Sequence, residues 1–154
     1  MDNSRTALLI LFSLFTPATA SEEVIISQIQ LAPIFEAAGN GNLNIISLEL
    51  SKGVSPNQLD EENGLSPLHY AVANNQIEAI KLLINSGANV NLKSREKWTP
   101  LHWAALLDRP EAAELLINSG AKRGIRGQEG RKALDLTTDP NMIKIIKKAK
   151  LSVG

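Results

Sequence analysis

The sequence contains no cysteine and only two histidines, which excludes several kinds of site at once. Without cysteine the chain forms neither disulfides nor thiolate metal sites. Aromatic residues make up 4% of the chain, and 16 Lys and Arg balance 16 Asp and Glu, so the overall charge favours neither nucleic acid nor an anionic membrane. Apolar residues make up 44% of the 154 residues, which suits one globular domain and is too many for a disordered chain.

The zero net charge conceals an uneven distribution along the chain. Residues 21–92 carry eight acids and two bases, whereas residues 121–154 carry nine bases and three acids. The folded molecule is therefore expected to be acidic at its start and basic at its end. Such a distribution serves either solubility and repulsion of wrong partners or steering of a dipolar partner, and the sequence leaves both open.

The first 20 residues have the form of a secretory signal peptide. Residues 7–15 are an apolar run of nine, far shorter than the roughly 20 residues that a membrane-spanning helix needs. Pro17 interrupts any helix, and Ala18-Thr19-Ala20 has the small-x-small form that signal peptidase reads, so cleavage before Ser21 is predicted. We therefore expect an exported protein, periplasmic or secreted, without stable membrane insertion after cleavage. The alternative is an uncleaved helix that tethers the chain to the membrane.

Two blocks of sequence recur at one spacing. Ser66-Pro67-Leu68-His69 returns as Thr99-Pro100-Leu101-His102, 33 positions later, and residues 82–88 return as residues 115–121 at the same offset. Two separate blocks with one period indicate a repeat protein. The pattern resembles the ankyrin family, whose repeat is a turn followed by two antiparallel helices, and the resemblance covers about residues 34–150.

The repeated blocks contain the start and stop signals of helices. Ser66 and Thr99 are expected to cap the first helix of their repeats, with a proline at the first helical position, where no N–H is needed. Leu68 and Leu101 are expected to point inward. Gly87 and Gly120 follow the second helix and are expected to take the left-handed conformation that ends it.

The two histidines occupy equivalent places one repeat apart. The resemblance implies that His69 and His102 hydrogen-bond backbone at the base of the turn and tie neighbouring repeats together. A role as metal ligand or general base is the alternative, but the structural role explains both residues at once.

Two weaker copies flank the clear repeats. Residues 37–53 match residues 71–87 at an offset of 34, and residues 130–136 match residues 97–103 at an offset of 33. The second helix of the last copy, about residues 140–150, is expected to be about three residues short. We predict an all-α solenoid of stacked helix–turn–helix ankyrin repeats with β-turn or hairpin fingers. Its parts are a signal peptide (1–20), an N-terminal extension (21–33), repeats at about 34–60, 61–93, 94–126 and 127–150, and a C-terminal tail (151–154).

A search for chemistry finds no motif typical of a zinc protease, a phosphate-binding loop or a nucleophile elbow. The acidic run at residues 60–64 lacks the ligand spacing of a calcium loop, and glycines 124, 127 and 130 fall on a turn, where glycine mainly permits tight bends. We predict a protein that is not an enzyme, has no cofactor and no metal, and binds another protein. The alternative is a small-ligand binder or small enzyme that uses the repeats as a scaffold.

The resemblance also implies where a partner binds, namely across the turn tips and the exposed faces of the first helices. On this chain these positions are Glu62, Asn63, Leu65, Asn74, Arg95, Glu96, Trp98, Leu106, Leu107, Gln128, Glu129 and Arg131. Among them, Trp98 and Leu106 are expected to form an apolar anchor, with Arg95 beside Trp98 and Leu107 next to Leu106. The alternative for Trp98 is local packing over its own turn. We expect the free chain to be monomeric, with a protein partner and no nucleic acid.

One residue departs from the repeat at the second turn. Lys97 stands where the neighbouring repeats have glycine, at a position that commonly requires positive φ. The sequence therefore predicts strain of about 1 kcal/mol in the turn before Trp98, or a reshaped turn.

Overall fold

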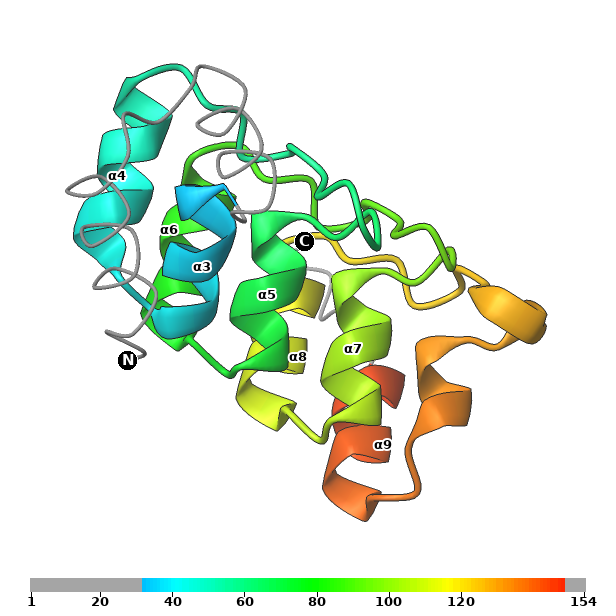
Figure 1. The fold of residues 1–154 in the computed structure, drawn as a ribbon. Helices are drawn as coiled ribbons and strands as arrows, with labels where there is room; N and C mark the ends of the chain where they lie inside the picture. Colours follow the sequence, from blue (N-terminus) through cyan, green and yellow to red (C-terminus); the bar gives the residue numbers. More distant parts are fainter. Residues whose placement is uncertain (1–31, 149–154) are drawn as a thin grey trace, which may run out of the picture. The chain divides into compact units, whose positions relative to one another are not determined.

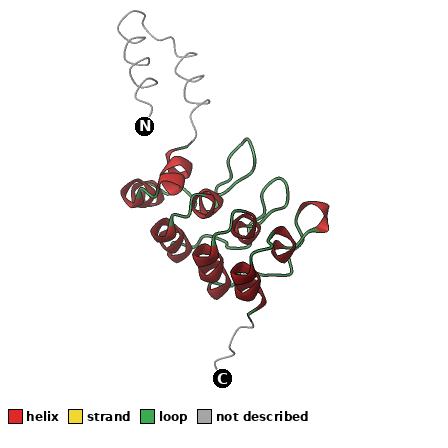
Figure 2. Ribbon diagram, turned by 90° about the horizontal axis from the view of Figure 1, so that it is seen from below, coloured by secondary structure: helices red, strands yellow, loops and turns green. Residues whose placement is uncertain are grey.

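The computed structural model of the protein describes residues 32–148, which form two rows of short antiparallel helices (Figures 1 and 2). The inner row consists of α3 (Pro33–Asn40), α5 (Pro67–Ala73), α7 (Pro100–Leu106) and the short 3-10 helix η2 (Ala133–Leu136). The outer row consists of α4 (Leu43–Ser51), α6 (Ile77–Asn85), α8 (Pro110–Asn118) and α9 (Pro140–Lys147). The predicted signal peptide, most of the extension at 21–33 and the tail lie outside the described residues.

Each helix packs only on its neighbours in the stack. Along the inner row α5 contacts α3 and α7, and along the outer row α8 contacts α6 and α9. The loops between the repeats project from one side as fingers, and no strand forms between residues 32 and 148 (Figure 2). We call residues 60–65 the first finger, 94–98 the second and 127–131 the third, which contains the 3-10 turn η1 (Gln128–Gly130). The all-helical repeat solenoid predicted from the sequence is confirmed.

Local sequence explains the helix boundaries. Pro67 begins α5, and the Ser66 hydroxyl accepts a hydrogen bond from the His69 N–H, which satisfies one of the free donors at the start of the helix. Gly87 and Gly120 follow the outer helices with φ of 94° and 101°, the left-handed region that favours glycine. Helices of seven to nine residues are too short to be stable alone, so their stability comes from packing.

The core lies between the two rows and repeats with the sequence. Leu68 and Leu101 of the inner row and Leu83 and Leu116 of the outer row are fully or almost fully buried, and alanines such as Ala71 and Ala104 let the rows approach closely. No helix among the described residues is long and apolar enough to cross a membrane.

The fourth repeat is shortened in a different place from the one predicted. Its outer helix α9 has eight residues, close to the nine of α6 and α8. Its inner element η2 has four residues, where α5 and α7 have seven. The offset between equivalent residues falls from 33 to 30 across this segment, since Pro140 begins α9 as Pro110 begins α8. The three missing residues therefore belong to the inner row, which ends early.

The second finger keeps the turn geometry of its neighbour despite Lys97. In the second finger Ser94 N–H donates to the Trp98 carbonyl at 2.8 Å, and in the third Gly127 N–H donates to the Arg131 carbonyl at 2.8 Å. Lys97 has φ of 65°, against 73° at the equivalent Gly130. The turn is not reshaped, so the lysine adopts the left-handed conformation and carries its strain.

We predict that Lys97→Gly stabilises the chain. The substitution relieves a left-handed lysine, a gain partly offset by the extra freedom of glycine in the unfolded chain, so the free energy of unfolding should rise by up to about 1 kcal/mol. Urea unfolding followed by far-ultraviolet circular dichroism measures this. Lys93→Gly, an exposed lysine for which no positive φ is found, is the control and should gain no stability.

Candidate functional site

The two histidines tie each inner helix to the finger that follows it. His69 Nε2 lies 3.0 Å from the Trp98 carbonyl oxygen, and His102 Nε2 lies 3.1 Å from the Arg131 carbonyl oxygen. On the other side of the ring, His69 Nδ1 accepts the Ser66 N–H at 3.1 Å. Nδ1 is therefore the acceptor and Nε2–H the donor, which is the arrangement of a neutral imidazole.

Burial keeps these imidazoles neutral. Desolvation lowers the pKa of His69 to about 4, against the opposing effect of its hydrogen bond to Trp98. Desolvation also lowers the pKa of His102, again against its hydrogen bonds to backbone. Both nitrogens of each ring are occupied within the repeat stack, so the structure assigns them to joining repeats.

Two further sets of polar ties join the repeats, and our reading of the sequence missed both. Asn57 donates to the Gly87 carbonyl at 3.2 Å and accepts the Asn89 N–H at 2.7 Å, and Asn91 repeats this arrangement with Gly120 and Lys122. The signal was present, because Asn57 and Asn91 are 34 positions apart, the offset of the first two repeats. At the opposite ends of the inner helices, the side chains of Gln76 and Arg109 donate to the carbonyls of Gly39 and Ala73.

The first finger is organised around one buried carboxylate. Asp60 is 6% exposed and accepts the N–H groups of Glu62, Asn63 and Leu65 at 2.9, 2.6 and 3.1 Å. The hydroxyl of Tyr70 donates to the same carboxylate at 3.1 Å. Desolvation alone would raise the pKa of Asp60, but these four hydrogen bonds outweigh it and lower the pKa below its ordinary value.

Arg95 fastens the second finger to the first. Its guanidinium donates to the carbonyls of Glu62 and Glu61 at 2.6 and 2.8 Å, and its own N–H donates to the Asn63 carbonyl at 3.0 Å. Three of the predicted contact residues, Glu62, Asn63 and Arg95, are thus brought together by contacts with one another. Their backbone groups hold the fingers in place, while the carboxylate of Glu62 stays on the surface.

Trp98 turns away from Arg95 and packs on the third finger. Its indole stacks on His102 with ring centroids 6.4 Å apart and meets Trp103 edge-on at 5.8 Å. A Cβ placed on Gly127 would lie 2.6 Å from Trp98 Cδ1, so the glycine is what admits the ring. Arg95 therefore does not lie against Trp98 as expected, because each side chain reaches a different neighbouring finger. Trp98 packs within the repeat stack, but on Gly127 of the third finger and not over its own turn as the alternative had it.

The third repeat carries the unsatisfied groups of the described part of the chain. The buried side-chain donors without a hydrogen-bond partner among residues 32–148 are the indole N–H groups of Trp98 and Trp103 and the Nε of Arg109. An unpaired buried donor costs on the order of 1–3 kcal/mol. The surroundings of α7 are therefore not optimised for stability alone.

Two aliphatic side chains lie exposed at the far end of α7. Leu106 is 44% exposed and Leu107 is 37% exposed, and they are the exposed large hydrophobic residues of the described inner row. Trp103 is half-buried one turn earlier on the same face of the helix. A helix of seven residues is about 10 Å long, which separates the aliphatic pair from the fingers at the other end of α7.

The remaining predicted contact residues are spread along the finger side and the inner row. Leu65 is half-buried in the first finger, Glu96 is exposed at the second, and Asn74 is exposed after α5, where its amide donates to the Tyr70 carbonyl. In the third finger Gln128 is exposed, and Glu129 pairs with Arg131 at 3.2 Å. The predicted contact residues thus fall into two groups, one on or near the fingers and the other at the end of α7, where the aliphatic pair lies.

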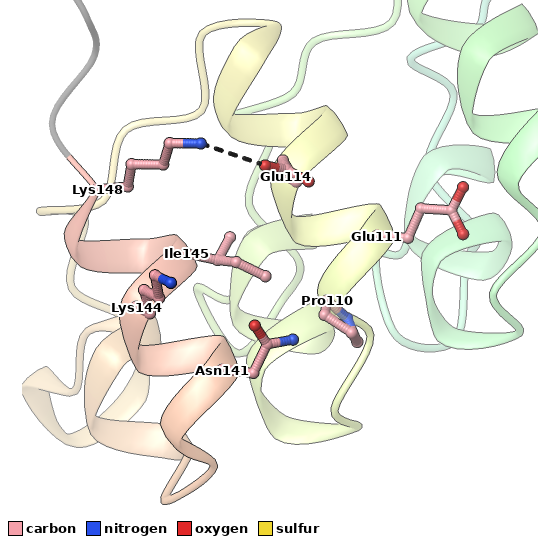
Figure 3. A pocket seen from close by; sticks show the side chains of 7 residues that line it. All are labelled: Pro110, Glu111, Glu114, Asn141, Lys144, Ile145 and Lys148. Atoms are coloured by element: carbon pink, nitrogen blue, oxygen red, sulfur yellow. Dashed lines mark ion pairs between the residues drawn. The ribbon is translucent and has the colours of Figure 1, made fainter.

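A shallow groove lies on the outer row between α8 and α9 (Figure 3). Its volume is about 380 Å³, and Pro110 and Ile145 supply its apolar surface. One wall carries Glu111 and Glu114, and the other carries lysines, of which Lys148 lies 3.8 Å from Glu114. The two paired side chains are more than half exposed, so water screens their charges and the groove offers a small ligand little binding energy.

Comparison with known proteins agrees with this architecture. The profile of the family described as "Ankyrin repeats (3 copies)" matches residues 34–127. The chain is 33% identical over 63 residues to the ankyrin repeat-containing protein P1E11.10 of Schizosaccharomyces pombe, a match covering 41% of this chain and 30% of that protein. It is also 42% identical over 64 residues to the palmitoyltransferase akr1 of Emericella nidulans, which covers 41% of this chain and 8% of that protein.

A solved structure shows the same fold. The crystal structure of the ankyrin repeat domain of Bcl-3, described as a unique member of the IkappaB protein family, superposes with a TM-score of 0.71 at 26% identity. The match covers 75% of this chain and 50% of that one. The chain thus spans less than a third of the curated relatives described above and half of the Bcl-3 chain.

Proposed function

This chain belongs to the ankyrin-repeat family, and on that premise we propose that it is an exported, non-catalytic module whose protein partner binds at the third repeat. Ankyrin repeats are generally protein–protein interaction modules, and their fold is typically a binding scaffold without enzymatic activity. The likeness to palmitoyltransferases is confined to 64 residues in one case and 45 in another, a small part of those proteins. Their catalytic activity is therefore not carried over to this chain.

The observation that carries the proposal is the exposure of Leu106 and Leu107. Other inner-row positions turned to solvent hold small or polar residues, such as Ala73 and Asn74 at the equivalent places in α5. Leu106 is 44% exposed and Leu107 is 37% exposed. A partner that covers them would gain about 25 cal/mol of free energy for each Å² of apolar surface removed from water. Among the described residues, the inner element that follows α7 is η2, which has four residues where α7 has seven.

We predict that Leu106→Asn with Leu107→Asn weakens capture of the partner about thirtyfold, the effect of losing one interface hot spot. The full chain, immobilised, is exposed to periplasmic and extracellular fractions of the source organism, and bound proteins are identified by mass spectrometry. A protein captured by the unaltered chain is then titrated against both chains by surface plasmon resonance.

The control is Leu43→Asn, which replaces an aliphatic of similar exposure, 38%, on the outer row. It should leave partner affinity unchanged. Equal binding by the α7 double variant and the unaltered chain would move the site away from α7. Turnover of a substrate by the purified chain would overturn the non-catalytic function itself.

Export is supported by residues 7–20, with their short apolar run and small-x-small ending. We predict that the chain expressed with residues 1–20 reaches the periplasm and has Ser21 as its first residue by intact mass. Ala18→Arg with Ala20→Arg should block cleavage and leave the uncut chain. Unaltered chain that stays in the cytoplasm at full length would rule export out.

A further inference from the structure

Positive charge is concentrated in the fourth repeat. Residues 122–148 contain eight bases and three acids, whereas residues 32–92 contain six acids and two bases. A surface that serves solubility alone mixes both signs and has a net charge away from zero. In this chain the signs are separated and the net charge is zero, so solubility does not account for the distribution.

The acids of this segment are already used inside the fold. Asp135 and Asp139 accept backbone N–H groups at 2.8 and 2.7 Å. Glu129 pairs with Arg131 at 3.2 Å, and Lys148 lies 3.8 Å from a carboxylate of α8. The remaining bases form no ion pair with any residue between 32 and 148, and they are Lys122, Arg123, Arg126, Lys132, Lys144 and Lys147. The fourth repeat therefore has an excess of positive charge that its own acids do not neutralise.

Four of these bases lie together on the side of the stack that carries the fingers. Arg123 follows α8, and its Nη1 donates to two carbonyls at the end of α9, at 3.1 and 2.5 Å. Arg126 Nη1 donates to a carbonyl of the third finger at 2.8 Å. Lys122 precedes Arg123, and Lys147 lies in the last turn of α9, which Arg123 contacts; both lysines are exposed. We call these four residues the basic surface.

We propose that the basic surface binds an acidic polypeptide segment. Its two arginines donate to neutral carbonyls, which hold the guanidinium groups in place without neutralising them. These bonds are made by Nη1, and for Nη2 of both side chains no hydrogen bond is found within the described chain. A guanidinium held in this way donates readily to the carboxylate of an aspartate or glutamate. The basic surface lies on the finger side, whereas Leu106 and Leu107 lie at the far end of α7, so the two contacts are separate.

Other anionic partners fit this surface less well. Single-stranded nucleic acids bind by stacking bases on aromatic side chains, and residues 122–148 contain no Phe, Trp or Tyr. Helices that lie on a membrane bury an apolar face in it, but Met142 and Ile146 of α9 are buried in the repeat stack. An acidic polypeptide needs neither feature, because its carboxylates reach exposed cations directly.

Fluorescence anisotropy of a labelled polyglutamate peptide, titrated with the full chain, tests this. The peptide should bind at about 25 mM NaCl, and its affinity should fall about tenfold by about 250 mM, because salt screens exposed charges. Lys122→Gln with Arg126→Gln and Lys147→Gln should weaken binding at low salt about tenfold, since each substitution removes one exposed ionic contact. Circular dichroism checks that this triple variant is folded.

The matched control is Lys52→Gln with Lys81→Gln and Lys93→Gln, which removes exposed positive charges from earlier repeats and changes the net charge equally. It should bind the peptide as the unaltered chain does. The proposal is overturned if the peptide does not bind at low salt, or if both triple variants lose equal affinity. It is also overturned if single-stranded DNA of the same charge, or vesicles containing phosphatidylglycerol, bind the basic surface more tightly than the peptide. Leu106→Asn with Leu107→Asn should leave peptide binding unchanged, which separates this surface from the α7 site.

Discussion

Acidification from about pH 7 to about pH 4 should cost the fold about 3 kcal/mol through His69 alone. The ring lies in the core of the repeat stack and is 1% exposed. Its Nδ1 faces the Ser66 N–H at 3.1 Å, so a proton added there would set two donors against each other. Protonation must therefore break the tie or open the repeat.

The direction follows from the two pKa values. The pKa of His69 is about 4 in the folded chain, below the ordinary 6.5 that it regains on unfolding. Above pH 6.5 both states are neutral and the full stability is present. As the pH falls toward 4, His69 becomes protonated in the unfolded chain but stays neutral in the folded chain. The free energy of unfolding therefore falls by about 1.4 kcal/mol per pH unit. Below pH 4 this group contributes no further loss.

Urea unfolding at several pH values measures this slope, and His69→Gln isolates it. Glutamine keeps an amide donor for the Trp98 carbonyl but does not titrate. The variant is expected to be less stable at neutral pH and to have a shallower slope between about pH 6.5 and pH 4. Asp60 overlaps only the lower edge of this window, because its pKa is lowered from 3.8 and most of its stabilisation is lost as the pH falls through and below that value. An unchanged slope in the variant would show that His69 is not the group responsible.

Much of the stack follows from the sequence because a period of 33 is imposed by packing. Pro67 and Pro100 mark helix starts, and the leucines that recur with them face the core, so the helices and their order could be read directly. What the period does not specify is where a copy gains or loses residues. The match between the first two repeats has an offset of 34, and the extra residue lies in the first finger. There the backbone N–H of Asp60 donates to the Leu65 carbonyl, five residues on, whereas in the second finger the N–H of Ser94 donates to the Trp98 carbonyl, four residues on.

The candidate site was harder to predict because side-chain direction depends on neighbouring repeats. Trp98 and Arg95 are three residues apart, yet one is drawn to the space over Gly127 and the other to carbonyls at Glu61 and Glu62. No local pattern contains that information. Leu106 and Leu107 were identifiable, since apolar residues stand there at a position that resembles exposed sites of the family.

Asp60→Ala should destabilise the chain by about 3 kcal/mol, more than is usual for a residue in a finger. Three backbone N–H groups and the Tyr70 hydroxyl lose their acceptor together. Water at the finger replaces part of what is lost, which keeps the cost below the sum of four charged hydrogen bonds. Asp60→Asn should cost about half as much, because one oxygen still accepts while the new amide group faces donors. Tyr70→Phe removes one bond and should cost about 1 kcal/mol.

The single tyrosine of the chain gives a second measurement that separates this network from general packing. Burial, the negative charge of Asp60 and the hydrogen bond to it raise the pKa of Tyr70 to about 12. In Asp60→Asn the charge is gone and burial remains, so the pKa should fall toward about 10 without reaching it. Ultraviolet titration of the phenolate measures the change, with circular dichroism at each pH to show that the helices persist. An unshifted tyrosine in a folded variant would mean that Asp60 does not organise the first finger through Tyr70. The first finger, to which Arg95 fastens the second, would then depend on the hydrogen bonds from backbone N–H groups to Asp60 and on the contacts of Arg95.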